Sequence, residues 1–162
     1  FTTIDISDKI SGHSKYTGGV LGPDGKIVFV PDYANKIGIF DPSDRNFTTI
    51  DISDKISGHS KYTGGVLGPD GKIVFVPDYA NKIGIFDPSD RNFTTIDISD
   101  KISGHSKYSG GVLGPDGKIV FAPYTVDNIG ILELENRDLA YEVSGSIPEA
   151  WSSLLSPHFN KY

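Results

Sequence analysis

Histidine is the side chain that titrates nearest to neutral pH, and it occurs at the same place in each of three repeats of this sequence. A lysine follows each histidine two positions later, and an aspartate and a tyrosine follow further along the first two repeats. The candidate ligand-binding residues are His13, Lys15, Asp32, Tyr33, His59, Lys61, Asp78, Tyr79, His105 and Lys107. Binding residues are often loop residues on a rigid frame, so one interpretation is a ring of equivalent small sites for a repetitive ligand such as a glycan. The alternative, which we favour, is that each histidine bonds neighbouring backbone, because a repeat copies neutral residues as faithfully as useful ones.

The repeat that carries these residues has a period of roughly 46 residues. Residues 1–46 recur unchanged as residues 47–92, and the third copy, residues 93–138, keeps the pattern until Phe121. The third copy then diverges most over Tyr124, Thr125, Val126, Asp127 and Asn128. A unique site, if the chain has one, would lie in that stretch or at Trp151. The favoured alternative is that these residues accommodate a C-terminal helix.

Each repeat predicts four short strands joined by turns. In the first repeat, residues 1–6, 16–21, 26–30 and 36–40 are rich in β-branched and aromatic side chains, and the segments between them are polar. The sequence Gly22-Pro23-Asp24-Gly25 predicts a tight turn, because proline presets one dihedral angle and Asp-Gly supplies the positive φ. Four short strands per period predict one antiparallel four-stranded meander.

A single meander of this size cannot cover both of its faces, so each sheet must be covered by its neighbours. Radial repetition of four-stranded blades about an axis achieves this, and the period lies between those of WD40 repeats, about 40–45, and kelch repeats, about 50. We therefore predict an all-β protein, a β-propeller of four-stranded antiparallel blades. The strand with Gly18 and Gly19 should be innermost, where backbones approach closely. A stacked β-solenoid is the main alternative.

The segment GPDGKIVFV followed by NKIGIFDP resembles blades of the streptogramin lyase, NHL and YVTN group of propellers. The resemblance covers all three repeats, and it implies a propeller blade rather than an activity. The acid–base histidine and glutamate of the lyases have no motif in this sequence onto which they could be placed.

Three blades do not close a ring, because propellers have about 4 to 8 blades. We assign residues 1–145 to three blades (repeats 1–46, 47–92 and 93–138), with residues 1–6 an outer strand and Leu139, Tyr141 and Val143 in the last outer strand. Residues 146–162 predict a short C-terminal helix or the start of a further blade. The expected partners are the remaining blades of a longer chain, which is favoured, or other copies of this chain that exchange outer strands.

The composition excludes some partners and suggests a compartment. The formal net charge is −6 without a basic stripe, which argues against nucleic acid and anionic membranes as partners. The chain has no cysteine, and it has no methionine and begins in mid-repeat, as a processed product or a fragment does. Asn46 and Asn92 each begin an Asn-Phe-Thr glycosylation motif, which favours an extracellular or secretory location.

The sequence predicts neither a metal site nor a catalytic site. Three imidazoles on consecutive blades lie too far apart for zinc, which needs nitrogen ligands at about 2.0–2.1 Å, and no loop has the D-x-D-x-D-G spacing of a calcium site. There is no G-x-S-x-G elbow or phosphate loop. We expect a non-enzymatic repeat module that acts as a scaffold or recognition protein and needs no cofactor. The alternatives are a lectin-like propeller with one site per blade and, third, an enzyme resembling streptogramin lyases.

Overall fold

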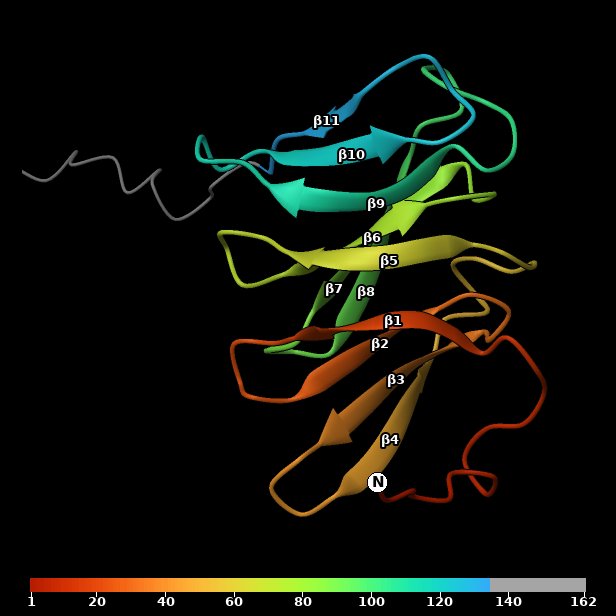
Figure 1. The fold of residues 1–162 in the computed structure, drawn as a ribbon, viewed down its shortest axis with the longest axis vertical. Coiled ribbons are helices and arrows are strands. Elements are labelled where there is room, and N and C mark those ends of the chain that lie inside the picture. The colour runs from red at the N-terminus through yellow and green to blue at the C-terminus, as the bar shows by residue number, and fades with distance from the viewer. Residues whose placement is uncertain (135–162) are drawn as a thin grey trace, which may run out of the picture.

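The computed structural model describes residues 1–134 and consists of three small antiparallel sheets (Figure 1). The first sheet, blade 1, has the strand order β1-β2-β3-β4 and follows the chain. Its strands are β1 (Tyr16–Leu21), β2 (Ile27–Pro31), β3 (Lys36–Asp41) and β4 (Asn46–Asp51). Blade 1 is therefore the predicted four-stranded meander.

The second and third sheets repeat this arrangement. Blade 2 has the order β5-β6-β7-β8, and its strands are β5 (Tyr62–Leu67), β6 (Ile73–Pro77), β7 (Lys82–Asp87) and β8 (Asn92–Asp97). Blade 3 has three strands among the described residues: β9 (Tyr108–Leu113), β10 (Ile119–Pro123) and β11 (Gly130–Leu132). The predicted class, an all-β protein of propeller blades, is confirmed.

The turn between the first two strands of each blade forms for a local reason. In blade 1 the Gly22 N–H donates to the Lys26 carbonyl at 2.8 Å, and the Gly25 N–H donates to the Gly22 carbonyl at 3.1 Å. Gly25 has a φ of 79°, a conformation that side chains with a Cβ rarely adopt. The Asp24 carboxylate accepts a further bond from the Lys26 N–H at 3.2 Å. The same turn recurs in the other two blades.

The first strand of each blade lies innermost, as predicted. Strands β1, β5 and β9 pack against one another in succession, and Figure 1 shows them stacked along the molecule. A Cβ built on Gly65 of β5 would lie 2.9 Å from a methyl group of Val20 and 3.0 Å from one of Val30. Glycine at this position is what allows blade 2 to approach blade 1 so closely.

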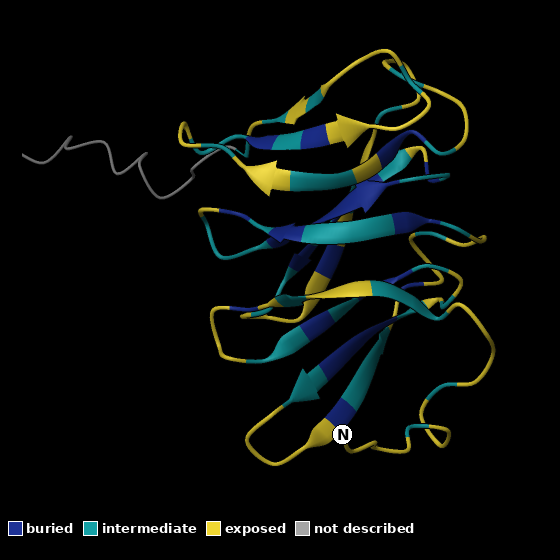
Figure 2. Cartoon of the chain, in the orientation of Figure 1, coloured by how far each residue is buried: buried dark blue, intermediate teal, exposed yellow. Residues whose placement is uncertain are grey.

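The hydrophobic core lies between the sheets (Figure 2). One cluster joins blade 1 to blade 2 and includes Ile37, Tyr62, Phe75 and Phe93. A second cluster joins blade 2 to blade 3 and includes Ile83. Each blade therefore completes the burial of its neighbour, which is why an isolated meander would be unstable.

One predicted strand is wrong. Residues 1–6 have the sequence FTTIDI and form no strand, although the same hexapeptide lies largely within β4 at residues 47–52 and within β8 at residues 93–98. In blades 1 and 2 the hexapeptide pairs with the preceding strand of the sheet, for example Ile37 with Ile50. No such strand is available to residues 1–6 among the described residues. The predicted last outer strand and C-terminal helix lie outside the described residues.

Acid should destabilise the turns that follow the outer strands. Asp97 accepts hydrogen bonds from the Ser99 hydroxyl at 2.6 Å and the Ser99 N–H at 2.8 Å, and these bonds lower the pKa of its carboxyl group. Asp51 and Ser53 repeat the arrangement, and the pKa of Asp51 is lowered for the same reason. A lowered carboxyl pKa stabilises the fold above the unfolded value of about 3.9, and that stabilisation is lost as the pH falls through the folded value.

We therefore expect the Tm, measured by circular dichroism, to fall between about pH 5 and pH 2. The double variant Asp51→Asn/Asp97→Asn should lose less stability over this range, because an amide oxygen accepts the same bonds without titrating. An acid dependence equal to that of the unmodified chain would contradict this assignment.

Candidate ligand-binding face

Two loops of each blade meet at one end of the strands and form the candidate face. In blade 1 the Tyr33 N–H donates to the Ser14 carbonyl at 3.0 Å, and the Asp32 N–H donates to the Lys15 carbonyl at 2.9 Å. Ser14 has a positive φ of 44°, which turns its carbonyl toward the second loop. Blade 2 repeats both bonds. This backbone pairing holds the histidine of one loop beside the tyrosine of the other.

The histidines and tyrosines of successive blades form one continuous row. The ring centroids of His13 and Tyr33 are 5.3 Å apart, and those of Tyr33 and His59 are 5.6 Å apart. The row continues from His59 to Tyr79 at 5.5 Å and from Tyr79 to His105 at 4.5 Å. We call these five side chains the ring row. Each tyrosine lies between the histidine of its own blade and the histidine of the next.

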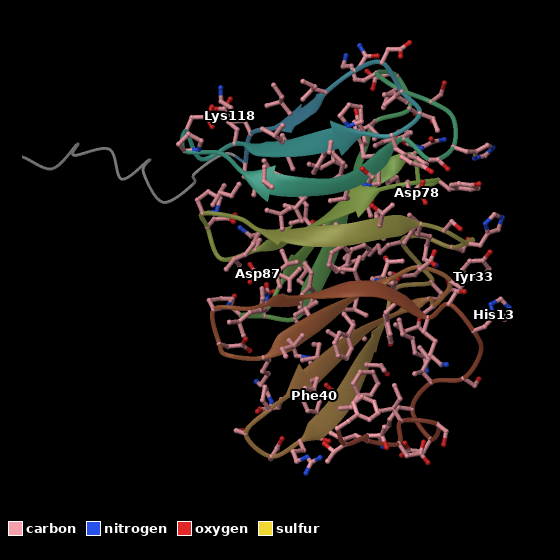
Figure 3. All side chains as sticks on the ribbon, viewed as in Figure 1. His13, Tyr33, Phe40, Asp78, Asp87 and Lys118 are labelled. Atoms are coloured by element: carbon pink, nitrogen blue, oxygen red, sulfur yellow. The ribbon has the colours of Figure 1, made fainter. Side chains whose placement is uncertain are left out.

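The ring row lies at the surface. The three histidines are exposed, Tyr33 is 43% exposed and Tyr79 is half-buried. Figure 3 shows His13 and Tyr33 on the same edge of the molecule as Asp78. The row ends in blade 3 because Thr125 replaces the tyrosine, and its hydroxyl donates to the His105 carbonyl at 2.8 Å. These histidines and tyrosines were predicted from the sequence as candidate binding residues, but their contacts across blades were not predicted.

The two aspartates beside the ring row are partly desolvated. Burial raises the pKa of Asp32, and the nearby charges of Lys61 and His59 oppose this rise. Burial likewise raises the pKa of Asp78, against the opposing effect chiefly of Lys107. Two partly buried carboxylates, which are potential hydrogen-bond acceptors, therefore lie beside the aromatic rings of the row.

Two of the predicted binding residues are interior groups that join blades. Lys61 is 1% exposed, and its Nζ donates to the carbonyls of Asp32 and Gly58 at 2.7 Å each and to Asn35 Oδ1 at 3.5 Å. Lys107 is 0% exposed, and its Nζ donates to the Gly104 carbonyl of its own loop at 2.7 Å. In blade 2 it donates to the Tyr79 carbonyl at 3.2 Å, one residue after the counterpart of Asp32, and to Asn81 Oδ1 at 3.4 Å. A ligand cannot reach these ammonium groups from the surface, so their role in the structure is to tie each loop to the preceding blade.

Lys15 occupies the same position in blade 1 but lies at the end of the array. It is half-buried, and among residues 1–134 its Nζ has no preceding blade to which it could donate. Lys15 therefore differs in environment from Lys61 and Lys107, although the local sequences are the same.

The two predicted glycosylation residues lie at the other end of the strands. Asn46 and Asn92 are exposed and begin β4 and β8, opposite Asp41 and Asp87 in the pairing register. Glycosylation stays a prediction. Within residues 1–134 no three histidine, aspartate or glutamate side chains are grouped so that they could hold a metal ion.

The fold and the stacking of blades define this chain as a β-propeller type of protein. A solved structure of virginiamycin B lyase from Staphylococcus aureus is similar, with a TM-score of 0.57 and 20% identity, over 80% of this chain and 45% of that chain. Hydrazine synthase of Kuenenia stuttgartiensis has a TM-score of 0.57 and 14% identity, over 82% of this chain and 36% of that chain. The resemblance to streptogramin lyase blades is thus confirmed at the level of the fold.

A third similar structure is the extracellular domain of a putative one-component system from B. thetaiotaomicron. Its TM-score is 0.59 at 11% identity, over 83% of this chain and 16% of that chain. The chain therefore spans less than half the length of each of these three solved proteins. No protein-family model and no curated protein matches the sequence. Within residues 1–134 no helix is long and apolar enough to span a membrane.

Proposed function

We propose that this chain is a non-enzymatic recognition module that binds its ligand along the ring row. The observation that carries the proposal is the continuous contact of five exposed or half-exposed rings across three blades. Rings that pack against each other are held in place, so little side-chain entropy is lost when a ligand covers them. A row of this kind suits an extended ligand better than a small compact one.

The ligand class that best fits the row is a glycan chain. Aromatic rings offer flat apolar surfaces to the C–H faces of sugars, while Asp32 and Asp78 accept hydrogen bonds from hydroxyl groups. Each blade contributes one histidine, and blades 1 and 2 each add one tyrosine in an identical loop. A polymer of repeating units can use such equivalent positions at the same time, which raises its overall affinity.

The proposal that the chain is not an enzyme is supported by the same repetition. A catalytic site is normally a single asymmetric arrangement of groups, whereas the loops of blades 1 and 2 have identical sequences. A lyase activity like that of virginiamycin B lyase remains the alternative suggested by the fold. We also propose an extracellular location, which is supported by the fold of the B. thetaiotaomicron extracellular domain and by the two Asn-Phe-Thr motifs.

Glycan binding is tested with the full chain and hexasaccharides derived from cellulose, chitin and xylan. We expect at least one of them to bind in isothermal titration calorimetry, and Tyr33→Ala/Tyr79→Ala to weaken binding about tenfold or more. Two aromatic contacts worth about 0.5–1.5 kcal/mol each account for this, since 1.4 kcal/mol is tenfold in affinity. The control is Leu21→Ala, which removes a 63% exposed side chain at the other end of β1 from the row.

Two results would contradict the proposal. Failure of all three hexasaccharides to bind at millimolar concentration would exclude these glycans as ligands. Equal binding by the double variant and the unmodified chain would show that the ring row is not the binding surface.

A further inference from the structure

The outer side of blade 3, away from blade 2, carries an exposed apolar surface. Val112 is 64% exposed, Ile129 is 65% exposed and Ile131 is 66% exposed. We call these three side chains the end face. Monomeric proteins seldom leave neighbouring aliphatic side chains this exposed to water, so the end face indicates an interaction surface.

The equivalent residues of the other two blades are covered by the blade that follows. In blade 1 the counterparts of Ile129 and Ile131 are Ile37, which is 0% exposed, and Ile39, which is 6% exposed. In blade 2 the counterpart of Val112 is Val66, which is 7% exposed and packs against Gly111 of blade 3. The surfaces of blades 1 and 2 that correspond to the end face are therefore each buried by the blade that follows.

The surface that fits the end face is present elsewhere in the same chain. Blade 2 covers blade 1, and the repeat that forms most of blade 2, residues 47–92, is identical to residues 1–46. Blade 1 therefore presents, on its side away from blade 2, the same residue types that blade 2 presents to blade 1. Among the described residues no blade covers that side of blade 1. A second copy of the chain can consequently place its blade 1 on the end face of the first.

Blade 3 has three strands among the described residues, and residues 1–6 of a second copy fit beside β11 as the fourth. A cavity of about 270 Å³ lies between blades 2 and 3 and is lined by Ile83, Tyr108, Phe121 and Gly130, among others. At the corresponding place between blades 1 and 2, Phe93 of the outer strand stacks on Phe75 with centroids 5.8 Å apart and covers Gly84.

The residue of the repeat that corresponds to Phe93 and precedes blade 1 is Phe1. Its side chain is fully exposed in this structure. Phe1 of a second copy would therefore fill the cavity beside Phe121, in the way that Phe93 covers Phe75.

Charge complementarity also supports contact between blade 3 of one copy and blade 1 of a second copy. Lys61 and Lys107 donate to Asn35 Oδ1 and Asn81 Oδ1 of the preceding blade. At the equivalent position of blade 3 the residue is Asp127, which is exposed. Lys15 of a second copy would meet this carboxylate, so blade 3 carries a negative charge where the incoming lysine is positive.

We propose that two copies of this chain associate head to tail, with blade 1 of each docked on the end face of the other. Residues 1–6 of each copy add to β11 of the other as a fourth strand. Two such joints close a six-bladed ring, which lies within the range of about 4 to 8 blades of known propellers. The proposal does not depend on glycan binding by the ring row.

The first test is the mass of the full chain in solution by size-exclusion chromatography with light scattering. We expect twice the chain mass of 17.5 kDa. Phe1→Ala and Lys15→Glu should each shift the population toward a single chain, because they remove the cavity-filling ring and reverse the charge that faces Asp127. A single-chain mass at all concentrations, or an open series of larger species, would overturn the proposal.

The second test uses a disulfide between copies, since the chain has no cysteine of its own. The register pairs Ile39 with Thr48 and Ile85 with Thr94, so Ile131 should lie opposite Thr2 of the second copy. Directly opposed Cα atoms in antiparallel strands are about 4.5–5.5 Å apart, which suits a disulfide. We expect Thr2→Cys/Ile131→Cys to give covalent dimers on a non-reducing gel.

The matched control is Thr3→Cys/Ile131→Cys, in which the two side chains point to opposite faces of the sheet. It should remain largely uncrosslinked. Equal dimer formation in the control would overturn the proposed register. A disulfide within one chain in the Thr2→Cys/Ile131→Cys variant would overturn the exchange of strands between copies.

Discussion

Phe75→Ala should lower the free energy of unfolding by about 3–5 kcal/mol, the loss typical of a buried phenylalanine truncated to alanine. Phe75 is 0% exposed and belongs to the cluster that joins blades 1 and 2. Its ring lies 5.4 Å from that of Tyr62 and stacks on Phe93. The truncation would leave a cavity between two sheets that neither sheet can fill alone. Urea unfolding of the full chain measures the effect.

The control for this prediction is Tyr124→Ala, because Tyr124 is 71% exposed. Its truncation should change the free energy of unfolding by less than about 0.5 kcal/mol, as surface substitutions usually do. A loss of less than about 1 kcal/mol for Phe75→Ala would mean that the space between blades 1 and 2 is not close-packed.

Lys61→Met is expected to cost about 2 kcal/mol. It removes three side-chain hydrogen bonds, and the Gly58 carbonyl loses its ammonium donor. The Asp32 carbonyl keeps only the longer bond from the N–H of residue 61, at 3.3 Å. Each buried carbonyl that loses its partner costs about 1–3 kcal/mol. The removal of a desolvated charge offsets part of this loss. Burial also lowers the pKa of the Lys61 ammonium group, while the charge of Asp32 raises it.

The matched control is Lys55→Met, made in the same loop. The Lys55 side chain is 51% exposed and pairs with Asp54 at 3.2 Å at the surface, an interaction worth about 0–1 kcal/mol. Thermal unfolding should therefore separate the two variants clearly. If both variants had the same stability, Lys61 would not tie the blades together.

The repeat pattern predicted most of the fold correctly. The strand Tyr16–Leu21 was predicted with its observed bounds, and the other strands of blade 1 after residues 1–6 agree within about one residue. These elements depend on β-branched and aromatic residues and on the Gly22-Pro23-Asp24-Gly25 turn, whose hydrogen bonds are local. The innermost position of the strand with Gly18 and Gly19 was also predicted correctly, because a close approach of backbones requires a residue without a side chain.

The candidate face was predicted only in part. The sequence indicated that the histidines and tyrosines could form a ring of equivalent sites, and the bond from the Tyr33 N–H to the Ser14 carbonyl brings their loops together. It did not indicate that Tyr33 lies between two histidines, because His59 belongs to the next blade. It also treated Lys61 as a surface residue, since nothing local distinguishes an exposed lysine from one enclosed by a neighbouring blade.

The sequence by itself determined the period, the strands, the turns and the need for each sheet to be covered by another. Only the tertiary structure decided how identical residues differ: FTTIDI is a strand at β4 and β8 but not at residues 1–6, and Lys61 is buried while Lys15 is not. The physical reason is that strand pairing and burial are properties of a segment together with its neighbours. Identical segments have the same local sequence, but their neighbours in space differ from one blade to the next among the described residues.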